Sequence, residues 1–181
     1  IFTDSMQAAS DSLFYSLADS TFRLFTQPIV WTGNNQVTGD TIFLFTKNKK
    51  AERLYVAENG MMANQTADNM FNQLKGNRLN GFFRDGEIEY VRAKGNAESI
   101  YYIRDEDSSF VGINKASGDI IDLRFTNKEV EKVVFISEVK GIMYPVRDFP
   151  ASESILSNFI WQEKRRPRSK FALLSNEMEK E

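Results

Sequence analysis

Carboxylates are the main acid–base groups that this sequence offers for chemistry, because its 181 residues include no His and no Cys. The lack of His excludes the Ser-His-Asp and Cys-His nucleophile systems and every His-ligated metal site. The lack of Cys excludes thiol catalysis, Cys-ligated zinc, iron–sulfur clusters and disulfide bonds. Carboxylate, Lys, Tyr or Ser–Lys chemistry remains.

The acidic residues are spaced as charges at turns rather than as a catalytic pair. Asp85, Glu87 and Glu89 follow one another around an Asp-Gly turn, whereas a glycosidase needs two carboxylates about 5–10 Å apart across a cleft. The run 105–107 could collect Ca²⁺, but it lacks the Gly and the terminal Glu of a helix–loop–helix calcium site, so a polar loop is favoured. We expect no catalytic residue, no metal site and no cofactor.

The charge balance argues against a nucleic-acid partner. Lys and Arg number 23 and Asp and Glu number 25, a formal net charge of -2, whereas general nucleic-acid binding needs a positive field. No run approaches the ~20 apolar residues of a membrane span. The chain begins at Ile1 without Met and without a visible signal peptide, so we expect a mature product or a segment of a longer protein.

Short β-rich runs, separated by turn residues, dominate the chain. Asn59-Gly60 and Asp85-Gly86 are strong hairpin signals because these residue types tolerate positive φ. Strand candidates recur about every ten residues, which predicts an all-β sandwich, roll or solenoid. They lie at residues 21–25, 41–45, 53–56, 87–91, 99–103 and 132–136.

The strand candidates are arranged in a sequence repeat. With Gly39, Gly76 and Gly118 as anchors, similar residues return near 36–56, 73–93 and 114–135. Each unit reads as a strand, a polar turn and a returning strand, a hairpin that must stack on copies of itself. A glutamate follows each anchor by thirteen residues, and we place it beside the turn, where its charge stays in water. These glutamates are Glu52, Glu89 and Glu131.

The apolar positions of the repeat predict a row on one strand face, which we call the apolar ladder. One interpretation is a closed, packed core. The other is an open trough for acyl chains, since burial stabilises by about 0.8 kcal/mol per CH₂ group. Spacing does not separate the two. The ladder consists of Ile42, Leu44, Leu54, Val56, Leu79, Ile88, Val91, Ile121, Leu123, Val133 and Phe135.

The C-terminal part differs from the repeats. Apolar residues at helical spacing follow Ser152, a candidate N-cap, and predict a short helix over 152–161. We expect one domain over 1–163 and a flexible basic and charged tail over 164–181. The basic stretch 164–170 suits either phosphate contacts, as on anionic lipid head groups, or a solubilising tail, and the second reading is favoured.

Several motifs, in their order and spacing, resemble the OstA-like proteins of the Bacteroidetes type. This family is related to the periplasmic proteins that carry lipopolysaccharide to the outer membrane. The resemblance covers roughly residues 8–168. It rests on DSLFY (11–15), QPIVW (27–31), NQVTGDTI (35–42), FNQLKG (71–76) and GNAESIYY (95–102).

The resemblance implies an open β-jellyroll whose inward residues, here the apolar ladder, hold the acyl chains of lipopolysaccharide or lipid A. It also implies a periplasmic, outer-membrane-associated location and no enzymatic activity. Implied partners are other OstA-like or outer-membrane assembly proteins, with end-to-end self-association. Two alternatives stay open: a connector without lipid that assembles through edge strands, and, less favoured, a carboxylate-dependent glycan-processing enzyme.

Overall fold

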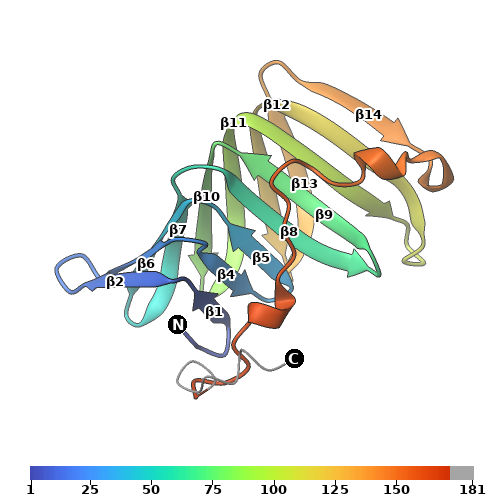
Figure 1. The fold of residues 1–181 in the computed structure, drawn as a ribbon. Helices are drawn as coiled ribbons and strands as arrows, with labels where there is room; N and C mark the ends of the chain where they lie inside the picture. Colours follow the sequence, from blue (N-terminus) through green and yellow to red (C-terminus); the bar gives the residue numbers. More distant parts are fainter. Residues whose placement is uncertain (172–181) are drawn as a thin grey trace.

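The structure, a computed structural model, describes residues 1–171 and folds them into one curled antiparallel sheet (Figure 1). The all-β class expected from the sequence is confirmed. The strands are β1 Met6–Ala9, β2 Ser12–Ser16, β3 Thr21–Phe25, β4 Ile29–Thr32, β5 Asn35–Thr38, β6 Thr41–Lys47, β7 Lys50–Val56, β8 Gly60–Ala67, β9 Met70–Gly76, β10 Arg78–Arg84, β11 Glu87–Arg104, β12 Phe110–Thr126, β13 Glu129–Ile136 and β14 Lys140–Tyr144.

Two long strands, β11 and β12, run through both halves of the sheet. On one edge β11 pairs first with β10 and then with β9. In the same way β12 pairs with β14 along its first part and with β13 along its second part. The first half-sheet therefore holds β1, β4, β5, β8, β9 and β14, with residues 96–104 of β11 and 110–118 of β12. The second holds β2, β3, β6, β7, β10 and β13, with residues 87–95 and 119–126.

The strands turn from one half-sheet into the other at glycine-rich corners. In β11, Gly95 (φ 81°) and Asn96 (φ 45°) take left-handed backbone angles where the register with β12 shifts, as in a β-bulge that bends a strand. Gly39 joins β5 to β6, and a Cβ there would lie 2.1 Å from Cγ1 of Val56 and 2.9 Å from the carbonyl oxygen of Glu58. The close approach of these strands thus requires glycine.

The stacked hairpins expected from the repeat make up most of the second half-sheet. They are β6–β7, β10 with the start of β11, and the end of β12 with β13; β7 pairs with β10, and β11 with β12. Their inward residues fall into two straight rows across the strands. The first row is Leu24, Ile42, Val56, Leu79, Ala93, Ile121 and Phe135, and the second is Phe22, Leu44, Leu54, Gly81, Val91, Leu123 and Val133.

The three repeat glutamates lie beside the hairpin turns, as the sequence predicted. Each reaches back to the partner strand of its own hairpin. A carboxylate oxygen of Glu52 lies 3.8 Å from Nζ of Lys47. An oxygen of Glu89 lies 2.7 Å from a guanidinium nitrogen of Arg84. An oxygen of Glu131 lies 2.6 Å from Oγ1 of Thr126. The charges stay in contact with water, so each pair contributes little to stability.

The short helix expected over 152–161 does not form. In its place are a 3-10 turn, η2 (Ala151–Glu153), and an extended segment; η1 (Val146–Asp148) and η3 (Glu163–Arg165) are also single 3-10 turns. The backbone of this segment finds partners on the sheet instead of within a helix. Leu156 N donates to Gln73 Oε1 and Gln162 N donates to Gln36 Oε1.

Residues 149–167, which we call the strap, cross the outer face of the first half-sheet (Figure 1). Leu156 lies in an apolar cluster with Met61, Ile100 and Ile113, and Phe159 packs against this cluster. Arg165 and Arg166, which the sequence placed in the tail, contact Gln27 and Gln7, and Pro167 is buried. The part of the expected tail over 172–181 lies outside the described residues.

Candidate functional site

The interior between the two half-sheets is where the apolar ladder lies. Nine of its eleven residues are buried, and Val133 and Phe135 are partly buried. Ten of them belong to the two rows of the second half-sheet, whereas Ile88 lies nearer the hairpin turn, opposite Phe83. The first half-sheet closes the interior from the other side with Val30, Val37, Met62 and Leu74. The sequence therefore identified the inward face correctly; acyl-chain binding by that face stays a prediction.

Packing in the middle of the interior is tight. A cavity of about 10 Å³, lined by apolar residues of both half-sheets, lies beside Gly81, the one row position without a side chain. A cavity of this size has room for about one water molecule. The central part of the ladder is thus filled by its own side chains.

A Gly81→Ala substitution is expected to stabilise the protein by about 0.5–1 kcal/mol, because it lowers the chain entropy of the unfolded state and fills part of the cavity. The new Cβ would stand 3.8 Å from Leu54 and Ile88 and 3.9 Å from Val91, ordinary contact distances. Urea unfolding measures the change. A matched Gly39→Ala variant is expected to lose stability, because its Cβ would collide with Val56; a loss at Gly81 as well would contradict the cavity.

The interior is less covered at the end formed by β13 and β14. Beyond these strands no described strand continues either half-sheet. Val130, Val133 and Phe135 are partly buried there, while Met143 of β14 is 57% exposed. We call this end of the interior the open end. Apolar residues from both half-sheets meet water there, as the mouth of a trough would require.

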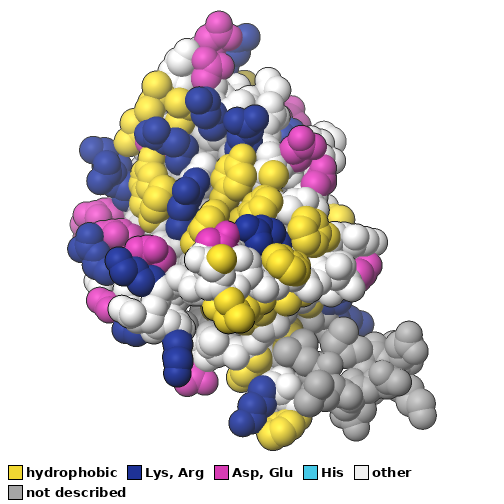
Figure 2. All heavy atoms as spheres, turned by 90° about the vertical axis from the view of Figure 1, so that its left-hand side faces the viewer, with side chains coloured by type: hydrophobic (Ala, Val, Ile, Leu, Met, Phe, Trp, Pro, Cys, Tyr) yellow, Lys and Arg dark blue, Asp and Glu magenta, His cyan; other side chains and the backbone are white. Residues whose placement is uncertain are grey.

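The outer face of the second half-sheet carries a group of residues that sequence reasoning missed. Arg53 lies over the rings of Phe45, Tyr55 and Phe82, between 5.2 and 5.8 Å from their centroids, and donates two hydrogen bonds to Asn80 Oδ1. Figure 2 shows the side with β2, β6 and β7, where hydrophobic side chains alternate with those of Lys and Arg. Cation–π contacts allow aromatic rings to remain at a wet surface.

Asp122 is the one buried acidic side chain among residues 1–171. Its two oxygens accept hydrogen bonds from Arg92 Nε and from a terminal guanidinium nitrogen, at 2.8 and 2.7 Å. Burial by itself raises the pKa of Asp122, but hydrogen bonds from Arg92 and Tyr90 outweigh it and hold the pKa below its usual range. The pair faces outward and has no second carboxylate, so it lacks the arrangement of a glycosidase.

An Asp122→Asn substitution is expected to cost about 1–3 kcal/mol at neutral pH, because the charge-assisted bonds to Arg92 are lost. A carboxyl with a lowered pKa contributes stability that is present above its unfolded pKa of about 3.9 and lost as pH falls through the folded value. The two proteins should therefore converge in stability below about pH 4. Urea unfolding from pH 7 to pH 2.5 measures the free energy of unfolding of both proteins. A difference between them that stays constant over this range would contradict the prediction.

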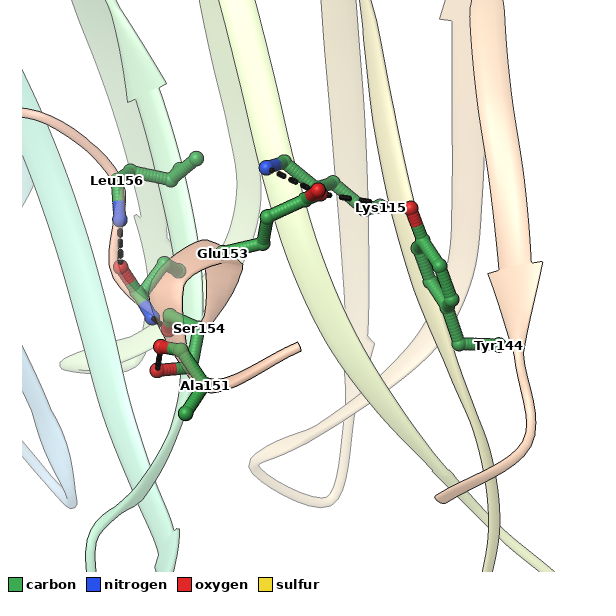
Figure 3. A network of polar contacts seen from close by, with 7 residues as sticks. Lys115, Tyr144, Ala151, Glu153, Ser154 and Leu156 are labelled. Atoms are coloured by element: carbon green, nitrogen blue, oxygen red, sulfur yellow. Dashed lines mark hydrogen bonds and ion pairs between the residues drawn. The ribbon is translucent and has the colours of Figure 1, made fainter. Parts of the chain in front are cut away.

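The strap is held by a line of polar side chains that sequence reasoning also missed as a site. Gln73 donates through Nε2 to the Ser154 carbonyl oxygen (2.8 Å) and accepts from Leu156 N (2.9 Å). Gln36 makes the same pair of bonds to Ile160 and Gln162. Two strands beyond Gln73, on β12, Lys115 Nζ lies 3.0 Å from Glu153, which Tyr144 also contacts (Figure 3).

A repeat signal marked these three positions. Gln36, Gln73 and Lys115 each precede an anchor glycine by three residues. They lie on the outer face of the first half-sheet, two strands apart for each step. The signal could have predicted a shared role, but nothing in the local sequence says that the chain returns over them.

The remaining candidate features stay as polar surface. Asp105 Oδ1 accepts hydrogen bonds from the backbone N–H groups of Asp107 and Ser109 in an exposed turn, which closes the loop on itself. Within residues 1–171 no group of three or more acidic side chains is arranged to hold a metal ion. The described residues also include no helix with the length and apolarity to pass through a membrane.

Comparison with known proteins identifies the fold. No protein-family model matches the chain, and no curated protein does either. Among solved structures, the chain is similar to LptH, the LptA homologous periplasmic component of the conserved lipopolysaccharide transport device from Pseudomonas aeruginosa. The TM-score is 0.58 at 15% identity over 77% of this chain and 95% of LptH. The chain therefore has the LptH fold, a strongly curled antiparallel half-barrel, as the OstA-like resemblance implied.

Proposed function

We propose that this protein is a periplasmic binding module that shields the acyl chains of lipopolysaccharide or lipid A during transport to the outer membrane. The observation that carries the proposal is the interior: two continuous apolar rows that run from a packed centre to the open end at β13 and β14. The likeness in fold to LptH, a component of a lipopolysaccharide transport device, supports it.

Binding proceeds by burial of apolar surface, without any reaction. An acyl chain enters at the open end, between Val133 and Phe135 of β13 and the facing part of β14. Each CH₂ group that leaves water contributes about 0.8 kcal/mol. The cavity at the centre of the interior measures only about 10 Å³. An acyl chain long enough to pass from the open end into the centre therefore requires the two half-sheets to move apart.

A matched pair of substitutions on β13 tests this role. Val133 faces the interior and Val134 faces the opposite side of the same strand, and both are partly buried. Val133→Asn should weaken the binding of fluorescently labelled lipopolysaccharide by about fivefold or more, because it places an amide in the path of the chain. Val134→Asn should leave binding unchanged. Equal effects of the two substitutions would contradict a binding site in the interior.

A second role is favoured by the exposed strands at both ends of the sheet. Leu13, Phe14 and Tyr15 of β2 and Ile142 and Met143 of β14 are exposed, and each of these strands has one partner. Unpaired edges are templates for strand addition. A connector that stacks through these edges should form larger species as its concentration rises, which light scattering without lipid detects; a monomer at every concentration would exclude this role.

A further inference from the structure

A row of uncharged polar side chains borders the apolar interior on the first half-sheet. It lies one step further from the corners than the inward residues Val30, Val37, Met62 and Leu74. We call it the amide row, and its members are Thr32, Asn35, Asn64, Asn72, Tyr101 and Asn114. None of them is charged, and four of the six are asparagines.

The amide row faces the second half-sheet across the interior. Side chains alternate between the two faces of a strand, so Asn64 and Asn72 share the inward face of Met62 and Leu74, which lie in the core. Tyr101 is partly buried, and its pKa is raised first by burial and next by the charge of Glu129, in agreement with an inward position. Glu129 begins β13 in the second half-sheet. The wall opposite the amide row stays apolar out to Ile88 and Phe125.

Amide groups of the row have hydrogen-bond donors or acceptors that are not used within residues 1–171. Asn64 Nδ2 donates to the Asn34 carbonyl oxygen and Asn72 Oδ1 accepts from Tyr102 N, which leaves one half of each amide group without a partner among residues 1–171. The Asn114 side chain makes no hydrogen bond to any described residue, although it is only partly exposed. The amide groups of such a row can both donate and accept hydrogen bonds. Sugar hydroxyl groups also do both, so the two kinds of group can pair with each other.

Ser99 adds an independent observation. Its side chain is 4% exposed, and its Oγ is buried without a hydrogen-bond partner in the described part of the chain. Ser99 pairs with Leu74 on one side and Ala116 on the other, on the inward face. It therefore lies between the apolar rows and the amide row. A buried hydroxyl without a partner is unfavourable, and a ligand acceptor at this point would remove that penalty.

The order of these groups matches the order of groups along an acylated sugar. From the apolar rows outward, the protein presents one hydroxyl donor and then a row of neutral amides. In an acylated sugar, the acyl chain is followed by an ester or amide carbonyl and then by the sugar hydroxyl groups. We propose that Ser99 donates to the acyl carbonyl and that the amide row binds an uncharged sugar head group, so that this protein selects glycolipids by their hydroxyl groups and not by phosphate. This inference rests on the proposed acyl-chain role of the interior.

Three amphiphiles with a twelve-carbon chain separate the parts of this inference. Lauroyl sucrose has an ester and a sugar, dodecyl maltoside has a sugar without a carbonyl, and lauroyl lysophosphatidate has an ester and a phosphate. Calorimetry below the critical micelle concentration gives each dissociation constant. The wild-type protein should bind lauroyl sucrose at least about tenfold more tightly than lauroyl lysophosphatidate, as two or so hydrogen bonds would produce.

Variants assign the preference to residues. Asn114→Leu should weaken both sugar amphiphiles about three- to tenfold and leave lysophosphatidate unchanged. Ser99→Ala should weaken the two esters by a similar factor and leave dodecyl maltoside unchanged, with no loss of folding stability. Asn80→Leu, on the outer face of β10, is the matched control and should change none of the three.

The outcomes are distinct. Equal or tighter binding of lysophosphatidate, or an unchanged preference in Asn114→Leu, overturns the head-group inference while the acyl-chain role stands. Absence of binding for all three amphiphiles, by a protein shown to be folded, overturns the proposed function and this inference with it.

Discussion

Replacing Leu54 with aspartate is expected to unfold the protein rather than only to block its interior. Leu54 is 3% exposed and pairs with Leu44 and Gly81 in the second row. The substitution removes a buried leucine, which costs about 2–5 kcal/mol, and adds a carboxylate without a partner, which costs several kcal/mol more. The sum of about 5 kcal/mol or more reaches the whole stability of a typical domain.

Circular dichroism and urea unfolding measure this outcome directly. The matched control is Tyr55→Asp, one residue on and on the outer face, where the new carboxylate would lie near Arg53. The control should remain folded, with a loss of no more than about 1–2 kcal/mol. A folded Leu54→Asp protein with nearly native stability would show that the central rows are open to water, contrary to the tight packing beside Gly81.

Replacing Gln73 with leucine should release the strap from the first half-sheet. The change removes both hydrogen bonds to the strap, as well as one to the Phe71 carbonyl oxygen, and leaves the buried N–H of Leu156 and the carbonyl of Ser154 without partners. Each unsatisfied buried group costs about 1–3 kcal/mol, so we expect a total of about 2–4 kcal/mol. Exchange of strap amides with deuterium should accelerate strongly around residue 156, while the amides of β11 should stay protected.

Gln65→Leu is the control for the strap. Gln65 belongs to β8, is exposed, and makes no hydrogen bond to the strap. Its substitution should change neither stability nor exchange by a measurable amount. If Gln73→Leu likewise leaves the exchange of strap amides unchanged, the apolar contacts of Leu156 and Phe159 alone hold the strap, and the glutamine bonds are dispensable.

The hairpin rows could be predicted because their signals are local. Apolar residues alternate with a period of two, and glycine recurs where each strand turns a corner, so this spacing alone predicts that Leu54, Val91 and Val133 share one face. The two long strands act as the common frame on which the hairpins stack. No local signal showed that β11 and β12 each belong to both half-sheets, because that depends on which neighbours pair with them.

The strap could not be predicted because its partners are far away in the sequence. Gln73 and Leu156 are 83 residues apart, and Gln36 and Gln162 are 126 apart. The spacing of Ile155, Leu156 and Phe159 suited a helix, but an extended segment buries Leu156, packs the partly buried Phe159 against the sheet and satisfies its backbone through glutamine side chains. Tertiary contacts here override a weak helical propensity.

The candidate site was predicted only in part, for a related reason. The spacing of apolar residues in the repeat identified the apolar ladder, but the openness at Val133 and Phe135 depends on β13 and β14 being the last strands. The amide row was invisible in sequence because its members come from β4, β5, β8, β9, β11 and β12 and meet only through the register of these strands. Ser99 in turn reads as an ordinary polar residue until its burial is known.

The binding of fluorescent lipopolysaccharide to the wild-type protein, with competition by lipid A and by an ordinary phospholipid, tests the central claim most directly. We expect saturable binding that lipid A displaces and the phospholipid does not, because the acyl chains occupy the interior and the sugar lies at its border. An absence of binding, by a protein whose circular dichroism shows it to be folded, would contradict this account. The apolar ladder would then be a closed core, and the exposed edges of β2 and β14 would carry the function.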